Sequence, residues 1–144
     1  MTPVHQTPGA ARGQNGDCFT ACVASAFDLP LAAVPNFFQR IENGQPIPPA
    51  ESKAFNAWLM QNQRCRYLEF GFRLTLTSLL LLMGTECRGI LWLLTGCTRH
   101  NSVHTVVARG GKILHDPGGM AVGTYLTRPC PDGVYRVGFF ALEL

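Results

Sequence analysis

The feature that most constrains the fold is a pair of adjacent glycines, Gly110 and Gly111, between two stretches of strand-forming residues. Residues 103–109 before them are rich in Val and Thr, side chains that pack well on a pleated sheet. Two successive glycines supply the backbone conformations that a two-residue hairpin turn requires, and residues 112–115 then return antiparallel. The sequence therefore predicts an antiparallel hairpin, and with it an antiparallel sheet in the C-terminal half.

Helical patterns occupy the first half of the chain. Apolar residues recur at helical spacing over residues 18–28 and 51–63, and Asp17 stands where a short acceptor side chain would cap the first helix. Helices followed by antiparallel strands define an α+β fold, with the N-terminal helices packed on an antiparallel sheet. Further elements are expected at residues 66–70 (strand), 76–83 (helix), 90–94 (strand) and 135–144 (strand).

The chain is the length of one domain. With 144 residues, 47% of them hydrophobic, it can bury a substantial core. We expect a single domain over residues 1–144, made of an extended arm at 1–16, a helical part at 17–64 and a sheet part at 65–144.

Charge and hydropathy exclude two classes of partner. The net charge is only +3, and the Lys and Arg residues are scattered, so no electrostatic footprint for nucleic acid is present. The longest apolar stretch, residues 79–84, is far shorter than the about 20 residues of a membrane-spanning helix. The first 20 residues lack a secretory signal, so we expect a cytoplasmic protein whose six cysteines stay reduced.

Cys18 falls in the first turn of the first predicted helix, directly after Asp17. Unpaired backbone N–H groups and the positive end of the helix dipole favour a negatively charged sulfur there. The thiolate is the nucleophilic form of cysteine, so Cys18 is a candidate nucleophile. Cys22, one turn further along, is expected to be a small buried hydrophobic residue.

A thiolate nucleophile needs a base, and the base needs an acceptor that orients it. His104 begins the first strand of the predicted hairpin and Asp116 follows the second, so the turn places both at the same end of adjacent strands. The alternative interpretation of this pair is a local hydrogen bond or a solvated ion pair. Packing of the first helix on the sheet must bring Cys18 to them, and the sequence alone does not predict that step.

These segments resemble the core of a papain-like cysteine peptidase, and most of all the bacteriocin-processing (double-glycine) peptidase family and small phage proteins related to it. The matching residues are Gly16–Ser25, Val103–Val107 and Ile113–Pro117, within about residues 4–30 and 90–120, under half of the chain. The resemblance implies that Cys18 is the nucleophile, His104 the base and Asp116 the carboxylate that orients the histidine. Phe19 departs from the family, which usually has glycine there.

The same family places a glutamine upstream of the nucleophile to stabilise the oxyanion. Gln14 lies four residues before Cys18 and Gln6 lies twelve before it, and either can serve if the arm loops back suitably. We favour Gln6, because it follows an extended segment that can lie along the site. A donor of this kind is worth about 10²–10³ in rate.

Residues beside the predicted catalytic group are candidates for substrate binding. Asp17 and Phe19 flank Cys18, while Asn101 and Ser102 belong to a polar loop that directly precedes His104. Loops in such positions border a cleft and are therefore expected to contribute to specificity.

Together these patterns predict a thiol-dependent hydrolase, a cysteine peptidase or amidase, that cleaves a peptide, isopeptide or side-chain amide bond in a peptide or protein substrate. No metal or cofactor is expected. One alternative is a catalytically inactive papain-like binding or inhibitor protein, phage-encoded and acting in a bacterial host. Another is a deubiquitinase-like deconjugase, because Gly-Asp-Cys-Phe resembles the ovarian-tumour deubiquitinases. Zinc binding by Cys97, His100 and His104 is disfavoured, because a fourth ligand is lacking.

Overall fold

The computed structural model describes residues 1–7, 17–37, 41–42, 45–46, 50–99, 101–119 and 126–143. Its helices are α1 (Cys18–Ala26), the 3-10 helix η1 (Leu31–Ala33), α2 (Ala50–Gln63) and α3 (Leu76–Glu86). Its strands are β1 (Ile41–Glu42), β2 (Gln45–Pro46), β3 (Cys65–Phe72), β4 (Leu91–Thr98), β5 (Val103–Arg109), β6 (Lys112–His115), β7 (Leu126–Arg128) and β8 (Tyr135–Leu142).

The central element is a six-stranded sheet with the order β3-β8-β4-β5-β6, to which β7 adds by pairing with the end of β4. All of its pairings are antiparallel. Strands β1 and β2 form a separate two-stranded pair. The predicted α+β class and the antiparallel sheet are therefore confirmed.

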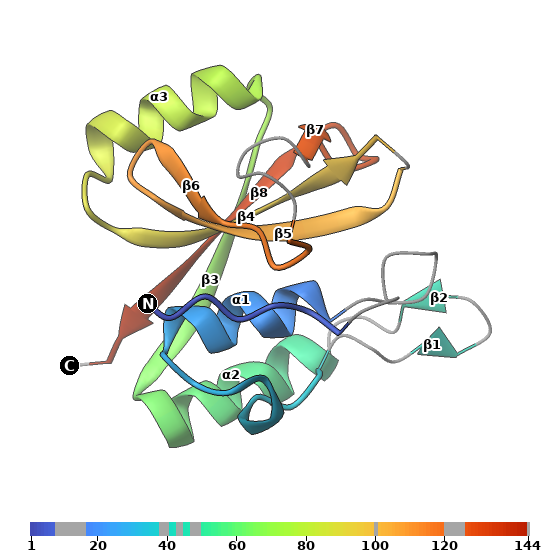
Figure 1. Ribbon diagram of the computed structural model, residues 1–144, viewed down its shortest axis with the longest axis vertical. Coiled ribbons are helices and arrows are strands. Elements are labelled where there is room, and N and C mark those ends of the chain that lie inside the picture. Colours follow the sequence, from blue (N-terminus) through green and yellow to red (C-terminus); the bar gives the residue numbers. More distant parts are fainter. Residues whose placement is uncertain are drawn as a thin grey trace.

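Helices cover both faces of this sheet. Figure 1 shows α1 and α2 on one face and α3 on the other. The predicted packing of the N-terminal helices on the sheet is seen for α1 and α2, whereas α3 covers the opposite face. The reason lies in β4, where neighbouring residues point to opposite faces and are both fully buried: Leu93 packs toward α1, and Trp92 toward α3.

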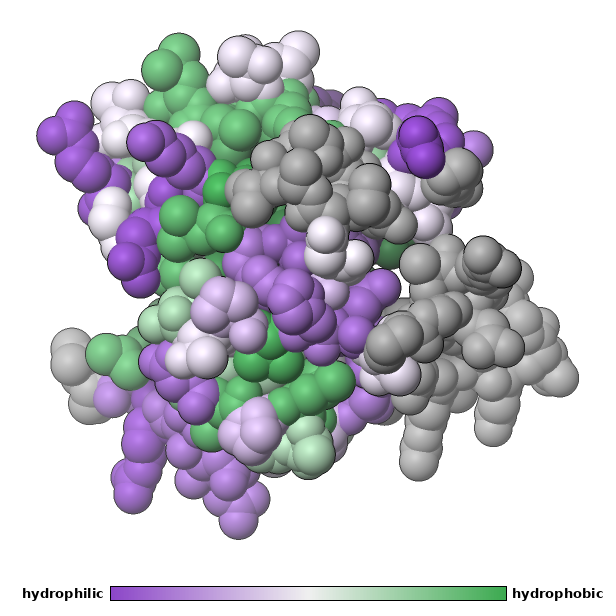
Figure 2. Space-filling view, viewed as in Figure 1, coloured by the Kyte–Doolittle hydropathy of each residue, from purple (hydrophilic) through white to green (hydrophobic). Residues whose placement is uncertain are grey.

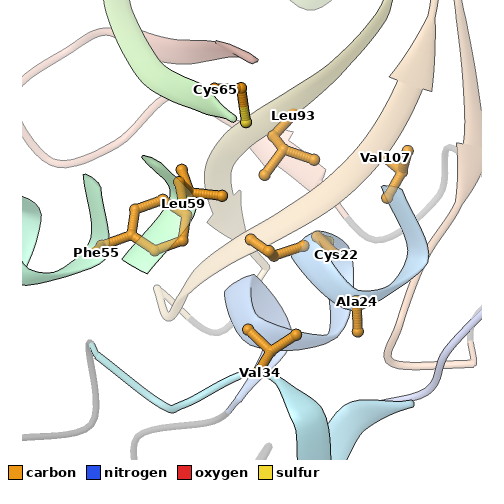
Figure 3. Packing of buried hydrophobic residues seen from close by; sticks show 9 residues of the cluster. Cys22, Ala24, Val34, Phe55, Leu59, Cys65, Leu93 and Val107 are labelled. Carbon is orange, nitrogen blue, oxygen red and sulfur yellow. The ribbon is translucent and has the colours of Figure 1, made fainter. Parts of the chain in front are cut away.

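Two hydrophobic cores result from this arrangement. The α1-side core, most of which Figure 3 shows, gathers buried residues of α1, α2, the sheet and the C-cap of η1: Cys22, Val23, Ala24, Val34, Phe55, Leu59, Cys65, Leu93 and Val107. The α3-side core holds Leu79, Met83, Trp92, Leu94, Val106, Ala108, Leu126, Tyr135 and Val137. A sheet packed on both faces holds its strands rigidly, which matters for the side chains at the ends of β5 and β6.

The predicted hairpin is present, with Arg109 paired to Lys112 across the turn. Gly110 has a φ of +51°, a conformation that side-chain-bearing residues rarely adopt. A Cβ at Gly111 would lie 2.7 Å from the carbonyl oxygen of Leu80, so the hairpin tip packs directly against α3. The glycines thus serve both the turn and this close approach.

The first helix is shorter than predicted, ending at Ala26 instead of residue 28. Phe27 lies at the C-cap and Asp28 adopts a φ of 55°, which the helix cannot continue. In the part of the chain that the structure describes, no helix combines the length and the apolar character needed to cross a membrane.

Packing in the α1-side core should contribute substantially to the free energy of unfolding. Leu93→Ala removes a fully buried side chain between the sheet and α1, and should lower that free energy by about 2–5 kcal/mol. Leu81→Ala is the matched control, because Leu81 is 73% exposed and its loss should change the value by less than about 0.5 kcal/mol. Urea unfolding measures both. Equal costs for the two variants would contradict this assignment of the core.

Candidate active site

Helix α1 carries Cys18 as its first residue and packs against β5. Cys22, one turn later, is fully buried, and its thiol donates to the backbone carbonyl of Thr105 at 3.2 Å. Burial raises the pKa of the Cys22 thiol well above its ordinary value, with smaller contributions from Cys18 and Asp116. Cys22 is therefore the buried, protonated residue that the sequence predicts, and it fixes α1 against the strand that carries His104.

His104 and Asp116 form a buried hydrogen-bonded pair. The Nε2 atom of His104 donates to Oδ1 of Asp116 at 2.7 Å, and the two side chains are only 5% and 0% exposed. His104 is the second residue of β5, and Asp116 follows the last residue of β6, so the hairpin brings them together. The predicted proximity of His104 and Asp116 is confirmed.

Cys18 completes the group, because its side chain is close enough to that of His104 to raise the pKa of the imidazole, as a hydrogen-bond partner and through its charge. Since Nε2 of the imidazole is bonded to Asp116, Nδ1 is the ring nitrogen that remains for the sulfur. Burial lowers the pKa of His104, but the hydrogen bonds to Asp116 and Cys18 outweigh it, and their charges add to this effect. The result is a pKa raised to about 9.

A tight turn presents the carboxylate to the imidazole. Residues 116–119 form a turn closed by the N–H of Gly119, which donates to the carbonyl of Asp116 at 3.1 Å. Aspartate first, proline second and glycine last are residues that such turns prefer. Within the turn, the N–H of Gly118 donates to Oδ1 of Asp116 at 2.8 Å, so this oxygen accepts from both Gly118 and His104.

Gly118 is a residue that the sequence analysis missed. A Cβ at this position would lie 3.1 Å from Oδ1 of Asp116 and 3.6 Å from Cε1 of His104. Only glycine leaves the carboxylate and the ring this close together without displacement. The signal was present in the sequence, since a glycine two residues after aspartate suits a backbone N–H that returns to the carboxylate.

Gln6 lies beside this turn, because its backbone N–H donates to the carbonyl of Pro117 at 3.0 Å. The Gln6 side-chain oxygen Oε1 is buried and has no hydrogen-bond partner among the described residues. Gln14, the other candidate for the oxyanion, falls outside the described residues. The structure therefore brings Gln6 beside the turn that carries Asp116.

The prediction that the Asp17 side chain caps α1 is wrong. Asp17 occupies the N-cap position, but its carboxylate accepts no hydrogen bond from the helix. Its backbone ψ is 27° instead of the extended value usual for a capping residue. Both carboxylate oxygens accept from Thr7 instead.

Phe19 packs into the α1-side core. Its ring lies edge-on to the rings of Phe55 and Tyr67, with centroid separations of 5.4 Å in both cases. These ring contacts hold the first turn of α1 against the α1-side core. Its predicted contact with substrate stays a prediction.

Asn101 and Ser102 lie in the turn between β4 and β5 and are both exposed. The turn is held by Thr98, whose N–H donates to the carbonyl of Ser102 at 2.9 Å and whose hydroxyl pairs with that of Ser102 at 2.8 Å. Ser102 is thereby ordered two residues before His104. His100, part of the disfavoured zinc set, falls outside the described residues.

Figure 2, in the same orientation as Figure 1, shows hydrophilic residues gathered in a band across the middle of this face. In Figure 1 the N-terminal residues run in front of α1 at this level.

Comparison with protein-family models, with curated proteins and with solved structures finds no match for this chain. Inference about function therefore starts from the geometry of Cys18, His104 and Asp116.

Removing the negative charge of Asp116 should lower the pKa of His104 below about 9, because the carboxylate raises it. Asp116→Asn tests this by NMR titration of the His104 ring protons. Asp132→Asn, which removes an exposed carboxylate paired with Arg136, is the control and should leave His104 unchanged. An unchanged His104 titration in Asp116→Asn would contradict the assigned pair.

The pair of His104 and Asp116 should also make the free energy of unfolding depend on pH. The pKa of His104 in the folded protein lies above its unfolded value of about 6.5. Its contribution to the free energy of unfolding is therefore fully present below about pH 6.5 and is lost as the pH rises through about 9. Denaturation measured from about pH 6.5 to about pH 9 should show a smaller loss of unfolding free energy in Asp116→Asn than in the parent protein.

Gly118→Ala should disturb the carboxylate without removing it. The added methyl group would press on Oδ1 of Asp116, and the pKa of His104 should fall as the hydrogen bond lengthens. Gly71→Ala is the matched control, because a Cβ there meets Val134 at an ordinary 3.5 Å. If both variants titrate at His104 like the parent protein, Gly118 has no positioning role.

Proposed function

We propose that this protein is a thiol-dependent hydrolase with a papain-like core, which cleaves a peptide, isopeptide or side-chain amide bond in a peptide or protein substrate. The observation that carries the proposal is one imidazole with two partners. His104 hydrogen-bonds to the Asp116 carboxylate at 2.7 Å, and the Cys18 side chain is close enough to the same ring to raise its pKa. A nucleophile, a base and an orienting acceptor in contact are the parts that covalent amide hydrolysis needs.

The chemistry begins with a proton held on His104. With a pKa of about 9, the imidazole carries the proton at neutral pH. Attack requires the thiolate form of Cys18, which a positively charged neighbour favours. The sulfur attacks the carbonyl carbon, and the carbonyl electron pair moves to oxygen. When the C–N bond breaks, His104 gives its proton to the leaving amine and a thioester remains.

Hydrolysis of the thioester restores the enzyme. Water attacks the thioester carbon while His104 accepts one of its protons. The C–S bond then breaks, the carboxylic acid leaves, and the thiolate forms again beside the protonated ring. Asp116 keeps Nε2 occupied throughout, so that Nδ1 always faces the sulfur.

Two donors are suited to stabilise the oxyanion. One is the backbone N–H of Cys18, which lies in the first turn of α1, where N–H groups have no partner within the helix. The other is the side-chain amide of Gln6, which the bond to Pro117 keeps beside the turn that carries Asp116. Donors of this kind act on the charge that develops during attack.

The resemblance to papain-like peptidases supports the same conclusion. Its residues occur in the order nucleophile, histidine and carboxylate, with the nucleophile at the start of a helix packed on the strand that carries the histidine. The rival interpretation, an inactive binding protein of this fold, predicts a Cys18 with no special reactivity.

The experiment is competitive alkylation with iodoacetamide at pH 6, followed site by site by mass spectrometry. Cys18 and Cys87 are both partly exposed, whereas the other four cysteines are buried, so Cys87 is an internal control that the reagent can also reach. Cys18 should react at least about tenfold faster than Cys87, because only the thiolate is nucleophilic. His104→Ala should remove this difference. Equal rates in the parent protein would favour the inactive binding protein.

A further inference from the structure

Several hydrogen bonds anchor the segment of residues 1–7 to α1, to Asp17, to His115 and to the turn that carries Asp116. We propose that Asp17 is a positioning residue, which holds the amide of Gln6 at the site by binding Thr7. The inference rests on the proposed function, because it needs an oxyanion for Gln6 to stabilise. It replaces the capping role that the sequence predicted for Asp17.

Two hydrogen bonds join Thr7 to Asp17, and we refer to them together as the clamp. They involve the backbone and the side chain of Thr7 and both carboxylate oxygens of Asp17. The backbone N–H of Thr7 donates to Oδ1 of Asp17 at 2.8 Å, and its hydroxyl donates to Oδ2 at 2.5 Å. Asp17 is only 9% exposed. A carboxylate this buried is stable only while its hydrogen bonds are made, so the clamp strongly favours one position of Thr7.

The clamp joins two neighbours of catalytic groups. Thr7 directly follows Gln6, and Asp17 directly precedes Cys18. On its other side, Gln6 donates its backbone N–H to Pro117, the residue after Asp116. Gln6 is therefore held between the chain beside the nucleophile and the chain beside the orienting carboxylate.

The rest of the segment is anchored on the same two elements. The N–H of Val4 donates to the hydroxyl of Ser25 in α1 at 2.9 Å, and the carbonyl of Val4 accepts from Nε2 of His115, at the end of β6, at 2.8 Å. Figure 1 shows this segment running along α1. His115 therefore anchors the segment of residues 1–7 and is not part of the Cys18, His104 and Asp116 group.

These contacts make Gln6 depend on its neighbours. Its side-chain oxygen is buried without a partner among the described residues, so that oxygen does not fix the amide. Release of Thr7 would let Gln6 shift while leaving Cys18, His104 and Asp116 in place. A shift of about 1 Å in a catalytic donor can cost about 10²-fold in rate.

The test compares two reactions of Cys18 in the full chain. Acetylation by p-nitrophenyl acetate passes through an oxyanion: the sulfur bonds to the carbonyl carbon, p-nitrophenolate leaves, and an acetyl thioester remains. Alkylation by iodoacetamide forms a C–S bond and releases iodide, with no oxyanion. Mass spectrometry follows both rates at Cys18. If Asp17 positions Gln6 through Thr7, loss of the clamp should slow the acetylation and leave the alkylation unchanged.

The variant is Thr7→Val, which keeps the shape of the side chain and removes the hydroxyl. We expect acetylation of Cys18 to slow at least about tenfold and alkylation to stay within about twofold of the parent rate. Thr7→Ser restores the hydroxyl and should restore acetylation. Thr2→Val is the matched control, because it removes the exposed hydrogen bond from Thr2 to Asp28 in the same segment.

Two results would overturn the proposal. Equal slowing of both reactions in Thr7→Val would show that the substitution merely loosens the fold, and no effect on either reaction would show that the clamp does not position Gln6. Failure of the proposed function has a different signature. In that case the parent protein itself would show no preference for Cys18 over Cys87 in either reaction.

Discussion

The hydrogen bond between His104 and Asp116 is the constraint on which the rest of the site depends. It is buried, charged and short, with both side chains almost fully withdrawn from solvent. A buried ion pair of this kind is weak evidence of stability, because desolvation offsets much of the attraction. The pair lies at the open end of the β5–β6 hairpin, with Cys18 on the remaining side of the imidazole ring. A functional role accounts for this arrangement better than a contribution to stability does.

The two-sided sheet supplies the rigidity that this constraint requires. Strand β5 is fixed from one face by α1, through Cys22 and its bond to Thr105, and from the other by α3, against which Gly111 packs. The sheet's close-packed cores limit how far His104 can move relative to Cys18. The N-terminal segment then lies over α1 and the end of β6, which adds Gln6 to the same place.

Local sequence signals predicted the parts of the site that depend on neighbours in the chain. The glycine pair predicted the hairpin, and the hairpin alone brings His104 to Asp116. The helix at Cys18 followed equally from its apolar spacing. These features arise from backbone geometry over fewer than about 15 residues, where propensity and turn chemistry have most influence.

The remaining features depend on contacts between distant segments, which no local pattern encodes. The docking of α1 on β5 joins residues 83 positions apart, through Cys22 and Thr105. Asp17 looked like a helix cap because its residue type and position fit one, but the arm offered its carboxylate a better partner in Thr7. The packing of α3 on the opposite face required knowing that the residues on both faces of β4 are buried.

The central claim is that the Cys18 sulfur interacts with the His104 imidazole while Asp116 holds the ring. Its most direct test is the effect of Cys18→Ala on the NMR titration of His104, since this variant leaves Asp116 untouched. The Cys18 side chain raises the pKa of His104 through a hydrogen bond and through its charge. The account predicts that this pKa falls below about 9 when the sulfur is removed. An identical titration in both proteins would contradict it, because the sulfur and the imidazole would then not interact.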